Sequence, residues 1–184
     1  MEEPMSNLIT ISETTESKEY WLHQGLGQGF EALLSAADAL IVPEKEFREG
    51  VAFVFHQDTT TLYRYLSTQL AGSLSIEICS NDDEYLEISL HSASFRLSKI
   101  VVNYVAAPLL VGMLTNYLYD EMKAKPTDNV EVTLIVEDHE CHSFKFSFKG
   151  EAKDFELLAD QVGELTKKCT IASEKKVMHS KVKK

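Results

Sequence analysis

The sequence predicts an α+β fold in which antiparallel β-hairpins carry packed helices. Three observations lead to this class: short runs that alternate apolar and polar residues, longer runs with apolar residues three and four apart, and polar turn residues between them. All three occur in the C-terminal half, where two hairpin-and-helix segments of similar plan follow each other. We therefore predict tandem ββα units in this half of the chain.

The first of these units begins with alternation over 74–78 and continues with alternation over 86–90. Residues 80–84 between these runs are Ser, Asn, Asp, Asp and Glu, and the first four are of types that form turns. The pattern predicts a hairpin that is followed by a helix beginning near Ser94.

The second unit alternates over 130–134 and 144–148, with the polar segment 138–142 between the two runs. Gly150 ends the second run, and apolar residues at helical spacing follow over 151–168. This unit therefore predicts a second hairpin with a helix directly behind it.

The N-terminal half predicts four elements: a strand at 7–12, a helix at 18–41, a strand at 50–55 and a helix at 59–71. Gly25, Gly27 and Gly29 interrupt the first helix, and each glycine costs about 1 kcal/mol in a helix interior. A helix start near Gly29 is therefore an open alternative. Pro43 ends the element in either case.

The twenty residues between Lys99 and Asp120 contain no charge. They predict a central helix that is apolar on every side, with Pro108 kinking or splitting it. Such a helix is either buried in the protein, in its core or at an oligomer interface, or inserted in a membrane. Polar residues such as Asn103 and Asn116 favour burial in protein.

A chain of this size has few elements with which to surround such a helix, so we expect a homodimer or higher oligomer. The stripe of apolar residues on the 151–168 helix is a second candidate for self-association. The predicted interface residues are Leu109, Leu110, Met113, Leu114, Tyr117, Leu118, Phe155, Leu158, Val162 and Leu165.

The charge is unevenly distributed along the chain, whose net charge is −11. Residues 166–184 hold seven lysines and one acid, which is +6, so the preceding 165 residues carry −17. This excludes general nucleic-acid binding apart from a contact of the basic end. We predict an N-terminal portion at 1–72 and a tandem portion at 73–169, or a single domain at 1–169, with 170–184 as a disordered basic tail.

Three short segments have residue types that could serve chemistry. The segment 138–142 (Asp-His-Glu-Cys-His) holds metal-ligand types, but neighbouring residues of one turn do not converge on one ion, so we expect His139, Cys141 and His142 to be turn residues. His56, Gln57 and Asp58 end a predicted strand and could be acid–base groups or turn residues. The glycines of 25–29 do not form a phosphate-binding motif.

The sequence assembles no catalytic set, so we predict a non-enzymatic accessory or regulatory subunit without metal or cofactor. This protein-binding subunit would self-associate or dock on a larger partner. One alternative is a membrane-associated effector that inserts the 100–119 helix, and a second is a small enzyme with an unrecognised site. Three scattered cysteines and the acids at Glu2 and Glu3 predict a cytoplasmic protein.

Overall fold

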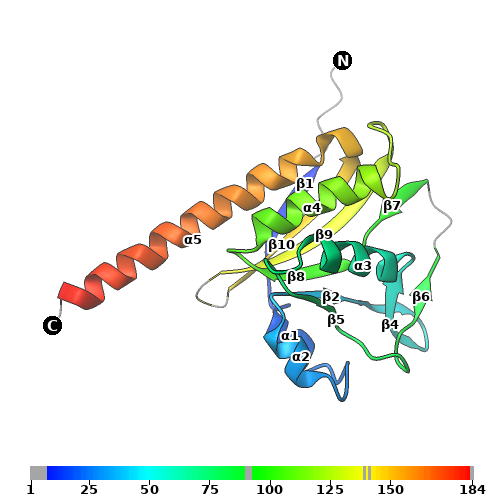
Figure 1. Ribbon diagram of the computed structural model, residues 1–184, viewed down its shortest axis with the longest axis horizontal. Helices are drawn as coiled ribbons and strands as arrows, with labels where there is room; N and C mark the ends of the chain where they lie inside the picture. Colours follow the sequence, from blue (N-terminus) through cyan, green and yellow to red (C-terminus); the bar gives the residue numbers. More distant parts are fainter. Residues whose placement is uncertain (1–7, 90–92, 139, 141, 183–184) are drawn as a thin grey trace.

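A computed structural model describes residues 8–89, 93–138, 140 and 142–182 (Figure 1). The predicted α+β class is confirmed: these residues form five α-helices and ten strands in two sheets. The strands are β1 (Ile9–Thr14), β2 (Ala39–Val42), β3 (Glu44–Arg48), β4 (Val51–His56), β5 (Ile76–Ile78), β6 (Glu87–Ile88), β7 (Ser94–Arg96), β8 (Lys99–Asn103), β9 (Asn129–Glu137) and β10 (Ser143–Glu151). The helices are α1 (Lys18–Leu22), α2 (Glu31–Ala36), α3 (Thr59–Gln69), α4 (Ala107–Asp120) and α5 (Glu156–Val182), with a 3-10 turn at Ala152–Asp154.

The larger sheet has the order β1-β10-β9-β8-β2-β5, and β7 also pairs with β9. Strands β9 and β10 form a regular antiparallel hairpin, whereas β8 pairs with β9 in parallel and β2 pairs with β5 in parallel. Because β2 lies between β8 and β5, a boundary at residue 72 would cut through this sheet.

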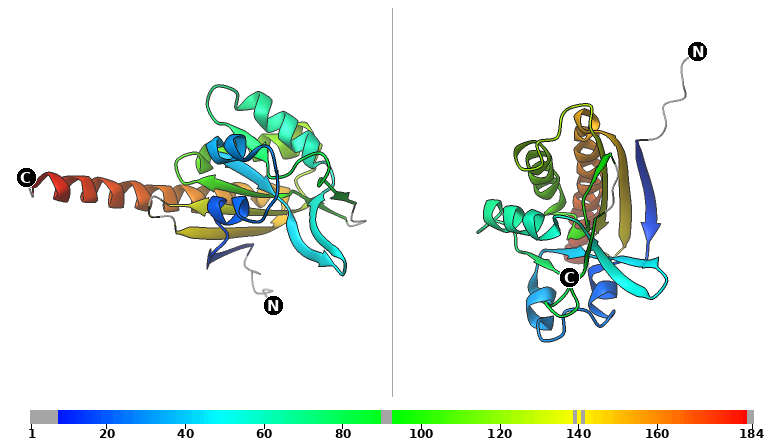
Figure 2. Two further views of the ribbon diagram at one scale, coloured as in Figure 1. Left: turned by 90° about the horizontal axis from the view of Figure 1, so that it is seen from below. Right: turned by 90° about the vertical axis from the view of Figure 1, so that its right-hand side faces the viewer.

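Helices cover the two faces of the larger sheet unequally. One face packs against α3, α4 and α5 in the main core, which includes Phe146, Phe148 and Phe155 (Figure 2). The other face carries a smaller core around Trp21, which α1 and α2 help to close. The smaller sheet, β3-β4-β6, includes a two-stranded ribbon that extends beside this second face (Figure 2).

The helix predicted over 18–41 is wrong in its extent, because α1 ends at Leu22, α2 spans six residues and Ala39–Val42 is the fully buried strand β2. Gly25, Gly27 and Gly29 have positive φ angles and form a loop between the two helices. At Gly27 a side chain could not be accommodated, because an added Cβ would lie 2.4 Å from Leu34 Cδ1.

The uncharged run is a strand followed by a helix rather than one helix. The β-branched residues at its start, within β8, are buried between β2 and β9, which favours a strand. Pro108 stands in the first turn of α4, where a proline costs no hydrogen bond, so it starts the helix instead of kinking it. In the described part of the chain no helix is both long enough and apolar enough to span a membrane.

The first predicted ββα unit differs from the prediction at its helix. Residues predicted to begin a helix near Ser94 form strand β7, which pairs with the start of β9. Its two strands, β5 and β6, are short and belong to different sheets. In the second unit, strands β9 and β10 are followed by α5.

The basic segment that was expected to be disordered continues α5 as far as Val182. Beyond Gly163 the sequence contains no further glycine and no proline, and seven of its residues are lysine, which favours helix. The helix has 27 residues and is therefore about 40 Å long.

Candidate functional site

Most of the predicted interface residues lie inside the chain's own core. Seven of them are at most 1% exposed: Leu110, Leu114, Tyr117, Leu118, Phe155, Leu158 and Val162. Met113 and Leu165 pack against this core and are partly buried, whereas Leu109 is 42% exposed. The faces of α4 and α5 that the sequence predicts to self-associate therefore contact each other and pack in the main core.

The last turns of α5 leave large apolar side chains exposed to solvent. Figure 1 shows the helix continuing well beyond the sheet and α4. We call residues 170–182 the free end of α5. Ile171 and Met178, two turns apart on one face, are 52% and 68% exposed. Ile171 follows the buried Cys169 by two residues, or about 200° around the helix, so this apolar stripe points away from the packed face.

One contact ties the free end to the body of the protein. Lys176 forms an ion pair with Glu140 at the turn between β9 and β10. Lys168 and Lys175 lie along one side of the apolar stripe and Glu174 lies along the other, and all three side chains are exposed. The free end is thus a basic amphipathic helix whose apolar side is in contact with solvent.

A hollow with the opposite character lies beside α2 and β5. We call it the acidic hollow; it is lined by Phe30, Leu33, Leu34, Tyr63, Glu77, Ile78, Ser80, Asn81 and Asp82. Phe30 and Leu33 are each 50% exposed, which is unusual for side chains of this size. The lining includes two carboxylates and no lysine or arginine.

The acidity of this hollow extends into the surrounding sequence. Residues 19–44 and 65–95 contain nine Asp and Glu residues and no Lys or Arg. Glu31, at the start of α2, accepts a hydrogen bond from the backbone of Gly29, and backbone hydrogen bonds lower its pKa, so it is ionised at neutral pH. This part of the surface therefore has a negative potential that would attract a basic segment.

A second candidate is centred on His56 at the end of β4, one of the segments singled out in the sequence. Its backbone N–H donates to Ser98 Oγ at 3.0 Å, and Thr59 Oγ1 donates to its carbonyl oxygen at 2.6 Å. The hydroxyls of Thr59 and Ser98 are buried and lie 2.6 Å apart. These bonds fix the β4–α3 turn and hence the direction of the His56 side chain.

Beside His56 lies a row of buried and half-buried charges. Glu44 Oε1 is 3.8 Å from His56 Nε2, and Glu44 Oε2 is 3.6 Å from Lys99 Nζ. Lys99 Nζ also lies 3.0 Å from Glu16 Oε2. The interaction with the His56 side chain, supported by the charge of Lys99, lowers the pKa of Glu44 despite its burial.

Arg96, on β7, is held by Glu131 of the neighbouring strand β9. Arg96 Nε lies 3.0 Å from Glu131 Oε2, and Lys149 Nζ lies 3.4 Å from the other oxygen of the same carboxylate. His56 and Arg96 both line two adjoining hollows of about 210 and 260 Å³. Arg96 is not among the residues singled out from the sequence, although it is the one Lys or Arg between residues 65 and 98.

The segment 138–142, which holds residue types that ligate metals, forms a turn in its described residues. His139 and Cys141 lie outside the residues that the structure describes. Asp138 Oδ1 accepts backbone N–H bonds from Glu140 and His142, at 2.8 and 2.9 Å. No group of three or more metal-ligand side chains converges anywhere in the residues that the structure describes.

Comparison with known protein families, with curated proteins and with solved structures gives no match for this chain.

Proposed function

We propose that this protein is a non-enzymatic protein-binding subunit that self-associates, with the free end of α5 from one copy docked in the acidic hollow of a second copy. The observation that supports this most strongly is the match between the two surfaces. One is an exposed apolar stripe with lysines along one side, and the other is an exposed apolar pair, Phe30 and Leu33, with carboxylates beside it.

The apolar part of the match would supply the affinity. Ile171 and Met178 together with Phe30 and Leu33 are four large apolar side chains that are at least half exposed in the single chain. Fully burying one such side chain gains about 1.5–3 kcal/mol. Their joint burial would offset a large part of the cost of association.

The charged part would supply attraction and orientation. The 166–184 segment carries +6 and the rest of the chain −17. The free end is about 20 Å long, and the Debye length at physiological salt is about 8 Å. The last turn of the helix, beyond the Lys176–Glu140 ion pair, is therefore partly screened from its own body and responds to the surface that it approaches.

A second copy is the occupant that the geometry favours. Figure 1 shows that α5 leaves the body away from α2, so a continuous helix does not return to the hollow of its own chain. A second copy supplies the hollow without any change in the fold. An isolated helical end of this length is marginally stable in water, so docking would also stabilise it.

We also assign the protein to the cytoplasm. Cys79 and Cys169 are buried free thiols in the structure, an arrangement that is typical of proteins kept under reducing conditions.

Sedimentation velocity of the full chain over micromolar concentrations tests the proposal. The unmodified protein is expected to sediment above its monomer mass of 20.7 kDa, and salt near 1 M should weaken the association. Ile171→Gln with Met178→Gln on the helix, or Leu33→Gln in the hollow, should raise the dissociation constant about tenfold or more. Val177→Gln is the matched control, because Val177 is equally exposed but about 100° away from the stripe.

A charge exchange gives an independent check of the pairing. Lys175→Glu and Asp82→Lys should each weaken association, and the double variant should recover part of the loss. A monomer at all concentrations would overturn the proposal, as would an oligomer that ignores these substitutions. If the protein is a monomer that binds a larger acidic protein, self-association is overturned and the acidic protein is the partner of the free end.

A further inference from the structure

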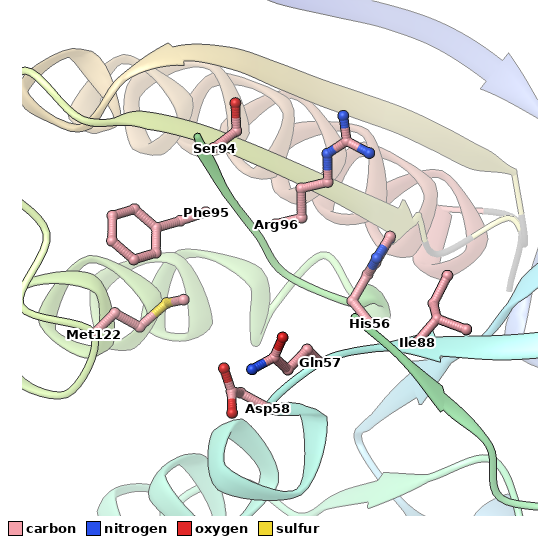
Figure 3. A pocket seen from close by; sticks show the side chains of 8 residues that line it. All are labelled: His56, Gln57, Asp58, Ile88, Ser94, Phe95, Arg96 and Met122. Carbon is pink, nitrogen blue, oxygen red and sulfur yellow. The ribbon is translucent and has the colours of Figure 1, made fainter. Parts of the chain in front are cut away.

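The smaller of the two hollows beside His56 has a distribution of charge that the proposed self-association does not use. It lies between the β4–α3 turn, strand β7 and the residues that follow α4. Figure 3 shows Asp58 and Gln57 at one end of this pocket, Arg96 at the opposite end, and Phe95 and Met122 along one side. The pocket therefore has an acidic end, a basic end and an apolar wall.

The acidic end is formed by a residue in an unusual conformation. Asp58 has a φ of +66° directly before α3, a left-handed conformation that few residues other than glycine adopt. Its carboxylate makes no capping hydrogen bond to the helix, although aspartate at this position commonly does so. The carboxylate is exposed and lines the pocket instead.

The surroundings strengthen the negative potential at this end. Burial, together with the carboxylates of Asp58, Glu121 and Glu87, raises the pKa of Tyr117 to about 12. Three carboxylates from three different elements therefore lie near one buried phenol. An ammonium group that enters beside Asp58 would be favoured by its carboxylate.

The basic end is held rigidly and retains positive charge. Arg96 and Lys149 share the single carboxylate of Glu131, so this trio has a net charge of +1. His56 is fixed through its backbone by Ser98 and Thr59 and is 3.8 Å from Glu44. A guanidinium group and an imidazole at one end of a pocket are suited to bind a carboxylate or phosphate.

From this arrangement we propose that the pocket binds a small zwitterion with its two charges at opposite ends of a short apolar chain, such as an ω-amino acid. The ammonium group lies beside Asp58, the acidic group beside Arg96 and His56, and the methylene chain against Phe95 and Met122. The volume of about 210 Å³ is below the range of about 300–1,000 Å³ for drug-sized ligands, which fits a molecule of this size.

Isothermal titration calorimetry of the full chain tests the proposal with a length series: 4-aminobutanoate, 5-aminopentanoate and 6-aminohexanoate. Because the two ends of the pocket are fixed, one length should bind best. It should bind at least tenfold more tightly than pentanoate or pentylamine, each of which carries one of the two charges. Asparagine tolerates the left-handed conformation at position 58. Asp58→Asn should weaken binding of the best amino acid at least tenfold and remove its advantage over pentanoate.

Two further variants complete the test. Arg96→Gln should remove the advantage over pentylamine, and Asp83→Asn, at an exposed carboxylate outside the pocket, should change nothing. Equal binding of pentanoate and the amino acids, or no binding of any probe at millimolar concentration, would overturn the zwitterion site. The result is independent of self-association, because Asp58 and Arg96 lie outside both proposed docking surfaces.

Discussion

The ammonium nitrogen of Lys99 lies 3.0 Å from a carboxylate oxygen of Glu16 and 5.6 Å from the centre of the Trp21 ring. Lys99 belongs to the central strand β8 and its side chain is 7% exposed, whereas Glu16 precedes α1. This ion pair joins the N-terminal segment to the middle of the sheet. Because Lys99 also lies 3.6 Å from Glu44, the charge is shared between two carboxylates.

Removing one of these carboxylates should be costly. Glu16→Gln is expected to lower the free energy of unfolding by about 1–3 kcal/mol, because a buried ammonium loses part of its compensation. Combining it with Lys99→Met should recover part of the loss, because an apolar side chain replaces the buried charge. Urea denaturation of Glu16→Gln, Lys99→Met and the double variant measures both effects, and additive losses would show that the pair is not coupled.

Leu109 and Leu110 are neighbours on α4 with opposite environments, so the same substitution should have different effects. Leu110 is fully buried, and Leu110→Asp should lower the free energy of unfolding by more than about 4 kcal/mol or prevent folding, because a charge would be buried without a partner. Leu109→Asp should stay within about 0.5 kcal/mol. Similar thermal denaturation curves for the two variants would contradict the position of α4.

The left-handed conformation of Asp58 predicts a gain in stability on substitution. Asp58→Gly should raise the free energy of unfolding by about 0.5 kcal/mol, since glycine adopts positive φ without strain and no capping bond is lost. Denaturant titration measures the change. Asp83→Gly provides the comparison, because Asp83 is not among the residues with positive φ and should lose stability with the same substitution.

Asp38 should contribute to stability in a pH-dependent manner. Its Oδ2 accepts hydrogen bonds from the backbone N–H and the hydroxyl of Ser75, both at 2.8 Å, and these bonds lower its pKa. A native pKa below the unfolded value of about 3.9 means that the contribution is complete at neutral pH and is lost as pH falls through the native pKa. The stability difference between the protein and Asp38→Asn should therefore shrink below about pH 4 in urea titrations.

The fold was predictable from sequence where local pattern and tertiary environment agree. Strands β9 and β10 alternate because one face packs in the core, and the polar turn between them marks the hairpin. Prediction failed where apolar spacing was ambiguous. Ala39–Val42 continued a helical spacing from α2, yet all four residues are buried between neighbouring strands, and periodicity alone does not distinguish such a strand from a buried helix.

The candidate site was predictable in part. His56, Gln57 and Asp58 were singled out as polar residues at a strand end, and all three line one pocket. Arg96 reaches that pocket only because β7 pairs in parallel with β9, a long-range contact without a local signal. The acidic hollow also depends on long-range contacts, because α2, α3 and β5 all contribute to it. Its negative charge could have been predicted from the absence of Lys and Arg in 19–44 and 65–95.

The pairing of β1 with β10 also has a consequence for how the chain is made. Thr14 lies opposite Ser143, a partner that is synthesised 129 residues later. At about 5–20 residues per second, the ribosome delivers that partner roughly 6–26 s after Thr14. Strand β2 waits a shorter time, because β5 and β8 follow it within about 60 residues. Strand β1 therefore spends most of translation without its neighbour, and nascent chains that stop before residue 143 should aggregate or recruit chaperones more than chains that include β10.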